Sequence, residues 1–174
     1  MIKEFNEAKF LSKVDNVFVK LFTAVMLDEL DKVKHFISDS IYDDYKNRNI
    51  KLNNINRRQM YDEINVKSSR INDIKQEDNK YIIEVLLDAR YMDYILDLNT
   101  GNKVSGDDTK RKDEKYKLIF KKDINALNQG EVRRCPGCGN PMDINNSGKC
   151  DYCRTIYNLE DYDWILDSIE KRLF

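Results

Sequence analysis

The stretch YIIEVLLDARYMDYILDL, residues 81–98, decides the fold of this chain because apolar and polar side chains alternate along it. Side chains two residues apart lie on the same face of a β-strand. Glu84, Asp88 and Arg90 fall on one face. The opposite face, which we expect to be buried, carries Tyr81, Ile83, Val85, Leu87, Ala89 and Tyr91. The pattern predicts a long strand that is half buried.

Two neighbouring stretches predict further strands. Residues 114–123, EKYKLIFKKD, alternate again and direct Tyr116, Leu118 and Phe120 inward. Residues 61–69, YDEINVKSS, predict a strand with a bend near Ser68. The segment NTGNKVSGDD, residues 99–108, has the composition of a turn region. A sheet of long antiparallel strands follows from this order.

Three helices are predicted before the sheet. Over residues 4–27 the apolar side chains recur at steps of three and four, which places them on one helical face. These side chains are Leu11, Val14, Phe18, Leu21 and Val25. A short helix is expected over residues 29–37, and Ser38 is a capping residue for a third over 39–56. Helices followed by antiparallel strands form an α+β fold, whose sheet would curl around the first helix.

All four cysteines lie between residues 135 and 153, in CPGCGNPMDINNSGKCDYC. Cys135 and Cys138 are separated by two residues, as are Cys150 and Cys153, and eleven residues lie between the two pairs. Two such knuckles direct four thiolates at one point, which is the geometry of a structural zinc site. Iron fits the same cage. We expect a metal without a catalytic role, because four thiolates leave no position for water.

The two knuckles differ in one residue. Gly137 and Gly139 suit the first knuckle, where a positive φ is expected, but Arg154 stands in the second where glycine would be easier. Two disulfides are the weaker alternative for these thiols in a reducing compartment. The tail DYDWILDSIEKRLF, residues 161–174, is predicted as a short helix packed through Trp164, Ile165, Ile169 and Leu173.

The length, net charge and apolar content of the chain argue against some classes of protein. The chain has 174 residues and a net charge of -1, which argues against a nonspecific nucleic-acid binder. No apolar run approaches the ~18–20 residues that span a bilayer, and the first ten residues do not resemble a secretory signal. We expect a cytoplasmic protein with a front domain over residues 1–124. Residues 125–174 would form the zinc ribbon and the C-terminal helix.

No catalytic motif is apparent in the sequence. His35, the only histidine, is expected to be a surface or packing residue. Asp88, Asp93 and Asp97 are more consistent with sheet edges and turns than with an acid–base pocket. Two basic stretches stand out: residues 46–58 have five basic and no acidic side chains, and residues 103–122 have eight basic and four acidic ones. On a shared face they would favour contact with an anionic membrane.

The order of these elements resembles the Tim44-like domain, the C-terminal domain of the mitochondrial import-motor scaffold, which has bacterial relatives. The similarity rests on the helical stretch 10–45 and on the turn motif formed by Asp97, Thr100, Gly101, Val104 and Gly106. A CPxCG…CxYC ribbon behind the domain is similar in several bacterial relatives. The resemblance implies a cone-shaped fold like that of nuclear transport factor two, in which helices and a bent antiparallel sheet enclose an apolar pocket.

The same resemblance implies a non-enzymatic binding or scaffold module, related to transport and peripheral at the inner face of a membrane. Its pocket would hold a protein segment or a lipid. The walls that we predict for this pocket are Phe18, Phe22, Tyr42, Tyr81, Tyr91 and Phe120. One alternative is a cone-fold enzyme, of the isomerase or dehydratase kind, with Asp88 or Asp93 in the pocket. The other is a nucleic-acid module built on the ribbon; residues 131–174 carry six basic and eight acidic side chains, which disfavours it.

Overall fold

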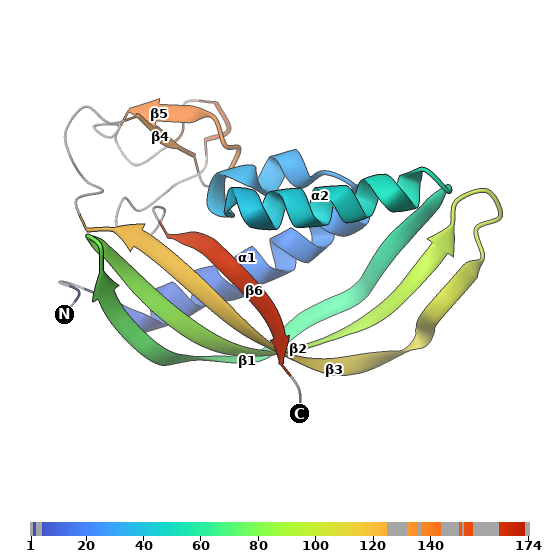
Figure 1. The fold of residues 1–174 in the computed structure, drawn as a ribbon, viewed down its shortest axis with the longest axis horizontal. Helices are drawn as coiled ribbons and strands as arrows, with labels where there is room; N and C mark the ends of the chain where they lie inside the picture. Colours follow the sequence, from blue (N-terminus) through green and yellow to red (C-terminus); the bar gives the residue numbers. More distant parts are fainter. Residues whose placement is uncertain are drawn as a thin grey trace.

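Three helical segments precede and cover one curved sheet in the computed structural model (Figure 1). The structure describes residues 2, 5–124, 132–135, 137–143, 150, 152–154 and 164–172. The helical segments are α1 (Glu7–Leu27), the 3-10 helix η1 (Leu30–Phe36) and α2 (Asp39–Asn53). None of the described helices has both the length and the apolar character needed to cross a bilayer.

The main sheet is antiparallel and has the strand order β1-β2-β3-β6. Its strands are β1 (Arg57–Glu77), β2 (Lys80–Asp97), β3 (Lys103–Asp123) and β6 (Ile165–Arg172). Asp78 and Asn79 join β1 to β2, and both have a positive φ, of 49° and 65°. Two such residues form the tight hairpin turn that matches the twist of the paired strands. The predicted α+β fold is confirmed.

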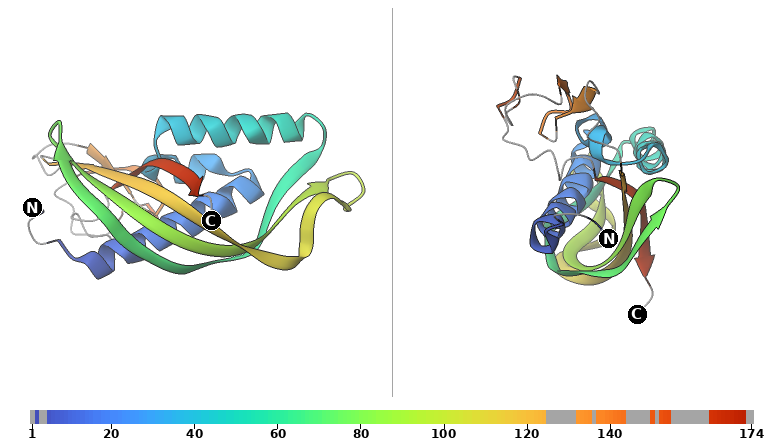
Figure 2. Two further views of the ribbon diagram at one scale, coloured as in Figure 1. Left: turned by 60° about the horizontal axis from the view of Figure 1, so that its bottom comes forward. Right: turned by 90° about the vertical axis from the view of Figure 1, so that its left-hand side faces the viewer.

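The alternation of residues 81–98 is confirmed on β2. Ile83, Val85, Ala89 and Tyr91 are fully buried, whereas Tyr81, near the start of the strand, is half-buried. The sheet bends around α1, so that its concave face meets the apolar face of that helix (Figure 2). The bend expected near Ser68 corresponds to an irregular register of β1 against β2 between Val66 and Ser68.

The turn expected over residues 99–108 is shorter in the structure, because β3 already begins at Lys103. Gly106 lies in this part of β3 with φ +86°, and a Cβ there would lie 2.3 Å from the carbonyl oxygen of Asp93. Glycine is therefore required at this close approach of β3 to the backbone of β2.

The helix predicted for the tail is wrong over the described residues 164–172. Residues 165–172 form β6, which pairs with β3 so that Leu118 faces Ile169. Trp164 and Leu166 are buried in the same core as α1. Ser38 secures the strand, since its N–H donates to the carbonyl of Leu166 and its hydroxyl to that of Asp167, both at 2.9 Å. The chain thus returns from the cysteine segment to complete the main sheet.

Candidate metal centre and exposed surfaces

The first cysteine knuckle lies in a short hairpin of β4 (Val132–Arg134) and β5 (Pro141–Asp143). The N–H of Cys135 donates to the carbonyl of Asn140 at 2.8 Å, and the N–H of Gly139 donates back to the carbonyl of Cys135 at 2.9 Å. The second knuckle repeats this turn, because the N–H of Arg154 donates to the carbonyl of Cys150 at 2.9 Å. Each knuckle therefore holds its two thiols on a tightly closed loop.

The four sulfur atoms gather at one point. The thiols of Cys135, Cys138, Cys150 and Cys153 all lie within 4.8 Å of one another. Sγ of Cys135 is 3.6 Å from Sγ of Cys153, and Sγ of Cys138 is 3.7 Å from Sγ of Cys150. No disulfide joins them. A tetrahedral ion with bonds of ~2.3 Å separates its sulfurs by ~3.8 Å, so the donor set fits a tetrathiolate metal site.

Backbone N–H groups point at two of the sulfurs. Those of Gly137 and Cys138 donate to Sγ of Cys135 at 3.2 and 3.4 Å, and that of Tyr152 donates to Sγ of Cys150 at 3.4 Å. Burial raises the pKa of the Cys135 thiol to about 12. The pKa of the Cys150 thiol is lowered instead, and the main cause is a hydrogen bond from the backbone N–H of Cys153. Thiolates are the form that binds a metal, so a cation bound here would displace the thiol protons.

The second knuckle contains the backbone strain that its sequence predicted. Gly139 and Arg154 occupy equivalent positions, four residues after the first cysteine of each knuckle, with φ +77° and +63°. Glycine adopts this left-handed conformation without steric cost, whereas in an L residue such as arginine the Cβ makes the conformation unfavourable. Arg154 therefore weakens the fold of its own knuckle.

His35 connects the first knuckle to the front of the chain. A Cβ added at Gly139 would lie 3.1 Å from Nδ1 of His35, and the imidazole also packs edge-on against Phe36, with ring centroids 4.7 Å apart. His35 is the packing residue that the sequence suggested. Its position against a knuckle more than 100 residues away could not be read from the sequence, which has no periodic signal that links the two.

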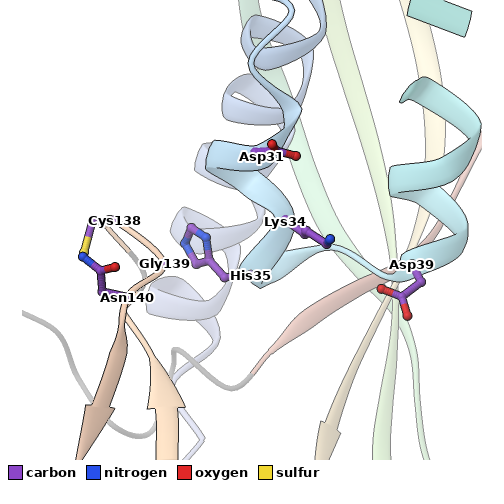
Figure 3. Close-up of a pocket in the computed structure, with 7 residues that line it drawn as sticks. All are labelled: Asp31, Lys34, His35, Asp39, Cys138, Gly139 and Asn140. Atoms are coloured by element: carbon purple, nitrogen blue, oxygen red, sulfur yellow. The ribbon is translucent and has the colours of Figure 1, made fainter. Parts of the chain in front are cut away.

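A cleft of about 510 Å³ lies beside this contact. Its lining comes from Asp31, Lys34 and His35 of η1, from Asp39 at the start of α2, and from residues 138–140 of the first knuckle (Figure 3). η1 lies between the knuckle on one side and Asp39 on the other, and the three segments together form a single polar surface.

The six residues predicted as pocket walls are not gathered at this cleft. Phe18, Phe22, Tyr91 and Phe120 belong to the buried core, where the rings of Phe18 and Phe22 stack with centroids 4.4 Å apart. Tyr81 is half-buried at the edge of that core. Tyr42 lies on α2, where its hydroxyl donates to Asp31. Their role as ligand contacts stays a prediction.

The carboxylates considered for catalysis form ion pairs. Asp88 is 3.7 Å from Nζ of Lys115, and its side chain is 40% exposed. Asp93 accepts a hydrogen bond from Gln59 at 2.6 Å and lies 2.8 Å from Nζ of Lys112. A carboxylate already neutralised by a lysine is a poor general base. This geometry gives no support to the enzyme alternative.

Exposed apolar side chains concentrate at one end of the molecule, which we call the sheet tip. Six large hydrophobic side chains are exposed in the described part of the chain, and five of them surround this end. The sheet tip comprises Leu27, Ile50, Ile55, Leu98 and Val104. It lies where α2 leads into β1 and where β2 turns into β3, on the right of Figure 1. A hydrogen bond of 2.8 Å from the N–H of Leu98 to the carbonyl of Asn56 joins the two connections.

Basic side chains accompany the sheet tip. Lys51, Arg57 and Lys103 belong to α2, β1 and β3, so the two basic stretches of the sequence have one end each near the sheet tip. Lys103 also lies 3.8 Å from a carboxylate oxygen of Asp108. Asp97 is engaged in the turn, because its carboxylate accepts hydrogen bonds from the N–H groups of Asn99 and Thr100. Sequence reasoning missed this surface. The available signal was the isolated apolar residues Ile55 and Val104 in otherwise polar segments.

Comparisons with known proteins found a similar family and a similar solved structure. A family model described as the Tim44-like domain matches residues 1–131. The crystal structure of the intermembrane space region of the chloroplast protein ARC6 is similar, with a TM-score of 0.46 and 9% sequence identity, over 92% of this chain and 94% of that one. No curated protein matches the chain. The family match covers well over half of the sequence, so the chain belongs to the Tim44-like domain family.

Proposed function

We propose that this chain is a non-enzymatic binding and scaffold module that attaches peripherally to an anionic membrane surface and serves a transport-related assembly. The sheet tip carries this proposal, since Leu27, Ile50, Ile55, Leu98 and Val104 are 41–56% exposed. Exposed apolar side chains that gather at one end of a molecule mark an interaction site. Basic side chains at the same end favour an anionic bilayer over a neutral protein surface.

We also propose that the cysteine cluster holds zinc in a structural role. Only thiolate donors are present, all four positions are filled by the chain, and free thiols persist in a reducing compartment such as the cytoplasm. The four residues Cys135, Cys138, Cys150 and Cys153 would hold the ion, which would fix the two knuckles against each other. Native mass spectrometry distinguishes bound zinc from bound iron. A red protein that contains iron would contradict the proposal that the metal is zinc.

Cosedimentation with phosphatidylserine-containing vesicles tests the membrane proposal. Burial of two aliphatic side chains contributes about 3 kcal/mol at most, and each basic residue near the surface adds about 1 kcal/mol. We therefore expect Ile55→Ser combined with Leu98→Ser to reduce the affinity for the vesicles about tenfold. Arg57→Gln combined with Lys103→Gln should also reduce it, and high salt should remove that difference.

Tyr152 provides the matched control. It is 70% exposed but lies on the second cysteine knuckle, away from the sheet tip. Tyr152→Ser should leave vesicle binding unchanged. The proposal would be contradicted if Tyr152→Ser lost as much vesicle binding as the sheet-tip variants. It would also be contradicted if the protein did not bind anionic vesicles at low salt.

A further inference from the structure

The cleft between η1 and the first knuckle has the features of a ligand site that is separate from the sheet tip. About 510 Å³ is within the range of volumes that bind small ligands or short peptide segments. Its walls consist of charged and polar side chains, a thiol and Gly139, with no aliphatic side chain and no aromatic ring besides the His35 imidazole. A lipid tail is therefore a poor match for the cleft, and a polar or charged ligand is a good one.

The fixed charges of the cleft are mainly negative. Asp31 and Asp39 each contribute one negative charge, and Lys34 contributes one positive charge. A divalent ion bound by four thiolates adds about two further negative charges, and Cys138 places one of these sulfurs in the wall. The sum is close to -3 with a neutral imidazole, so the cleft favours cations and disfavours phosphate groups.

Of the three charged side chains in the cleft, Asp31 and Lys34 are held in place, and Asp39 has no partner among the described residues. Tyr42 fixes both Asp31, by its hydroxyl hydrogen bond, and Lys34, whose Nζ lies 4.7 Å from the centre of the tyrosine ring. The carboxylate of Asp39, in contrast, makes no hydrogen bond or ion pair with the described residues, although it lines the cleft. An unpaired carboxylate next to positioned polar groups is available to bind an incoming cation.

We propose that this cleft binds an extended basic segment of a partner protein, with lysine or arginine side chains that reach Asp39 and the thiolate-bearing knuckle. Figure 3 shows the knuckle on one side of η1 and Asp39 on the other, so the ligand must extend across the 3-10 helix. A single small cation would contact only one of these groups. An extended peptide with basic residues at both ends satisfies both.

The site is complete only when the knuckle is formed. Cys138, Gly139 and Asn140 make up part of the wall, and a metal held by the four thiols would fix the conformation of this loop. Metal binding and peptide binding are therefore linked, and each must strengthen the other by the same factor. The metal would thus take part in no reaction, but its binding would control how well the partner binds.

Titration of the zinc-loaded full chain with a blocked tetrapeptide, arginine at both ends and glycine between, tests the proposal. We expect amide chemical shifts of residues 31–39 and 137–140 to change together, with little change for the analogue that has glutamine at both ends. Asp39→Asn should weaken binding about threefold to fivefold, as expected for one partly exposed ion pair. Asn140→Lys, which adds a cation to the cleft, should weaken it further.

Asp44→Asn is the matched control. It removes the same charge from α2, but Asp44 pairs with Arg48 outside the cleft at 2.9 Å, so binding should not change. The proposal is overturned if this variant loses as much affinity as Asp39→Asn. It is also overturned if metal-free protein binds the peptide equally well, or if inorganic phosphate shifts the same amides and the arginine peptide does not. Vesicle binding by the Asp39→Asn variant should stay normal, which separates this site from the sheet tip.

Discussion

Arg154 is the residue at which the local backbone and the local sequence disagree. Its φ of +63° is the one that Gly139 adopts in the other knuckle. Arg154→Gly should remove a steric cost of about 1 kcal/mol and tighten metal binding roughly fivefold, as measured by competition with a zinc chelator. Arg154→Ala removes the same charge but keeps a Cβ. If both variants tighten binding equally, the gain comes from charge and not from φ.

Asp15 on α1 has a carboxyl oxygen that is buried without a hydrogen-bond partner in the described structure. Burial raises the pKa of this carboxyl above 3.8, and a side-chain hydrogen bond with Ser69 lowers it by less. The folded state therefore keeps its proton to higher pH than the unfolded state. Stability falls as the pH rises from about 3.8 through the folded pKa.

Asp15→Asn should consequently raise the free energy of unfolding at pH 7, by up to about 1 kcal/mol. The advantage should shrink as the pH falls towards 3.8, because the wild-type carboxyl is then neutral as well. Urea unfolding followed by the fluorescence of Trp164, the only tryptophan, measures this difference. Asp43→Asn, at an exposed position of α2, serves as the control. A gain that is independent of pH would contradict the explanation.

At the scale of elements, periodicity predicted the segments whose packing is local. In α1 and in β2, one face of the element packs against the core, and that face sets the spacing of the apolar residues. The helix and the strand predicted from this spacing were therefore both correct. The apolar residues Trp164, Ile165, Leu166 and Ile169 fit a helix or a strand equally well, and only the pairing of this segment with β3 decides between them. The cysteine spacing likewise predicted that the four thiols gather at one point, whereas the contact of His35 with Gly139 depends on tertiary structure alone.

β6 should contribute substantially to the stability of the front of the chain. Leu166 is fully buried, faces Phe120 across the strand pair and lies in the core that includes α1. Leu166→Ala should reduce the free energy of unfolding by about 2–5 kcal/mol, as is typical of a buried leucine. Ser168→Ala, at an exposed position of the same strand, should change it by less than about 0.5 kcal/mol.

Urea unfolding of the two variants also tests whether the chain divides at residue 124. A Leu166→Ala variant as stable as the Ser168→Ala variant would mean that residues 165–172 are dispensable for the front domain. A large and selective loss would mean that one core spans the chain on both sides of the cysteine knuckles.

At the scale of the whole molecule, the cysteine knuckles lie within the connection from β3 to β6, so metal removal should affect the parts of the chain unequally. A chelator, or acid that protonates the thiolates, should abolish the hydrogen-exchange protection of the Gly139 and Arg154 amides. β1 and β2 should keep theirs, since their hairpin packs directly on α1. β6 should be intermediate. Without the metal cross-link it closes a longer flexible loop, which costs about 1 kcal/mol or less. Protected knuckle amides in the presence of chelator would contradict the metal site, whereas loss of protection throughout β1 and β2 would show that the knuckles and the sheet fold as one unit.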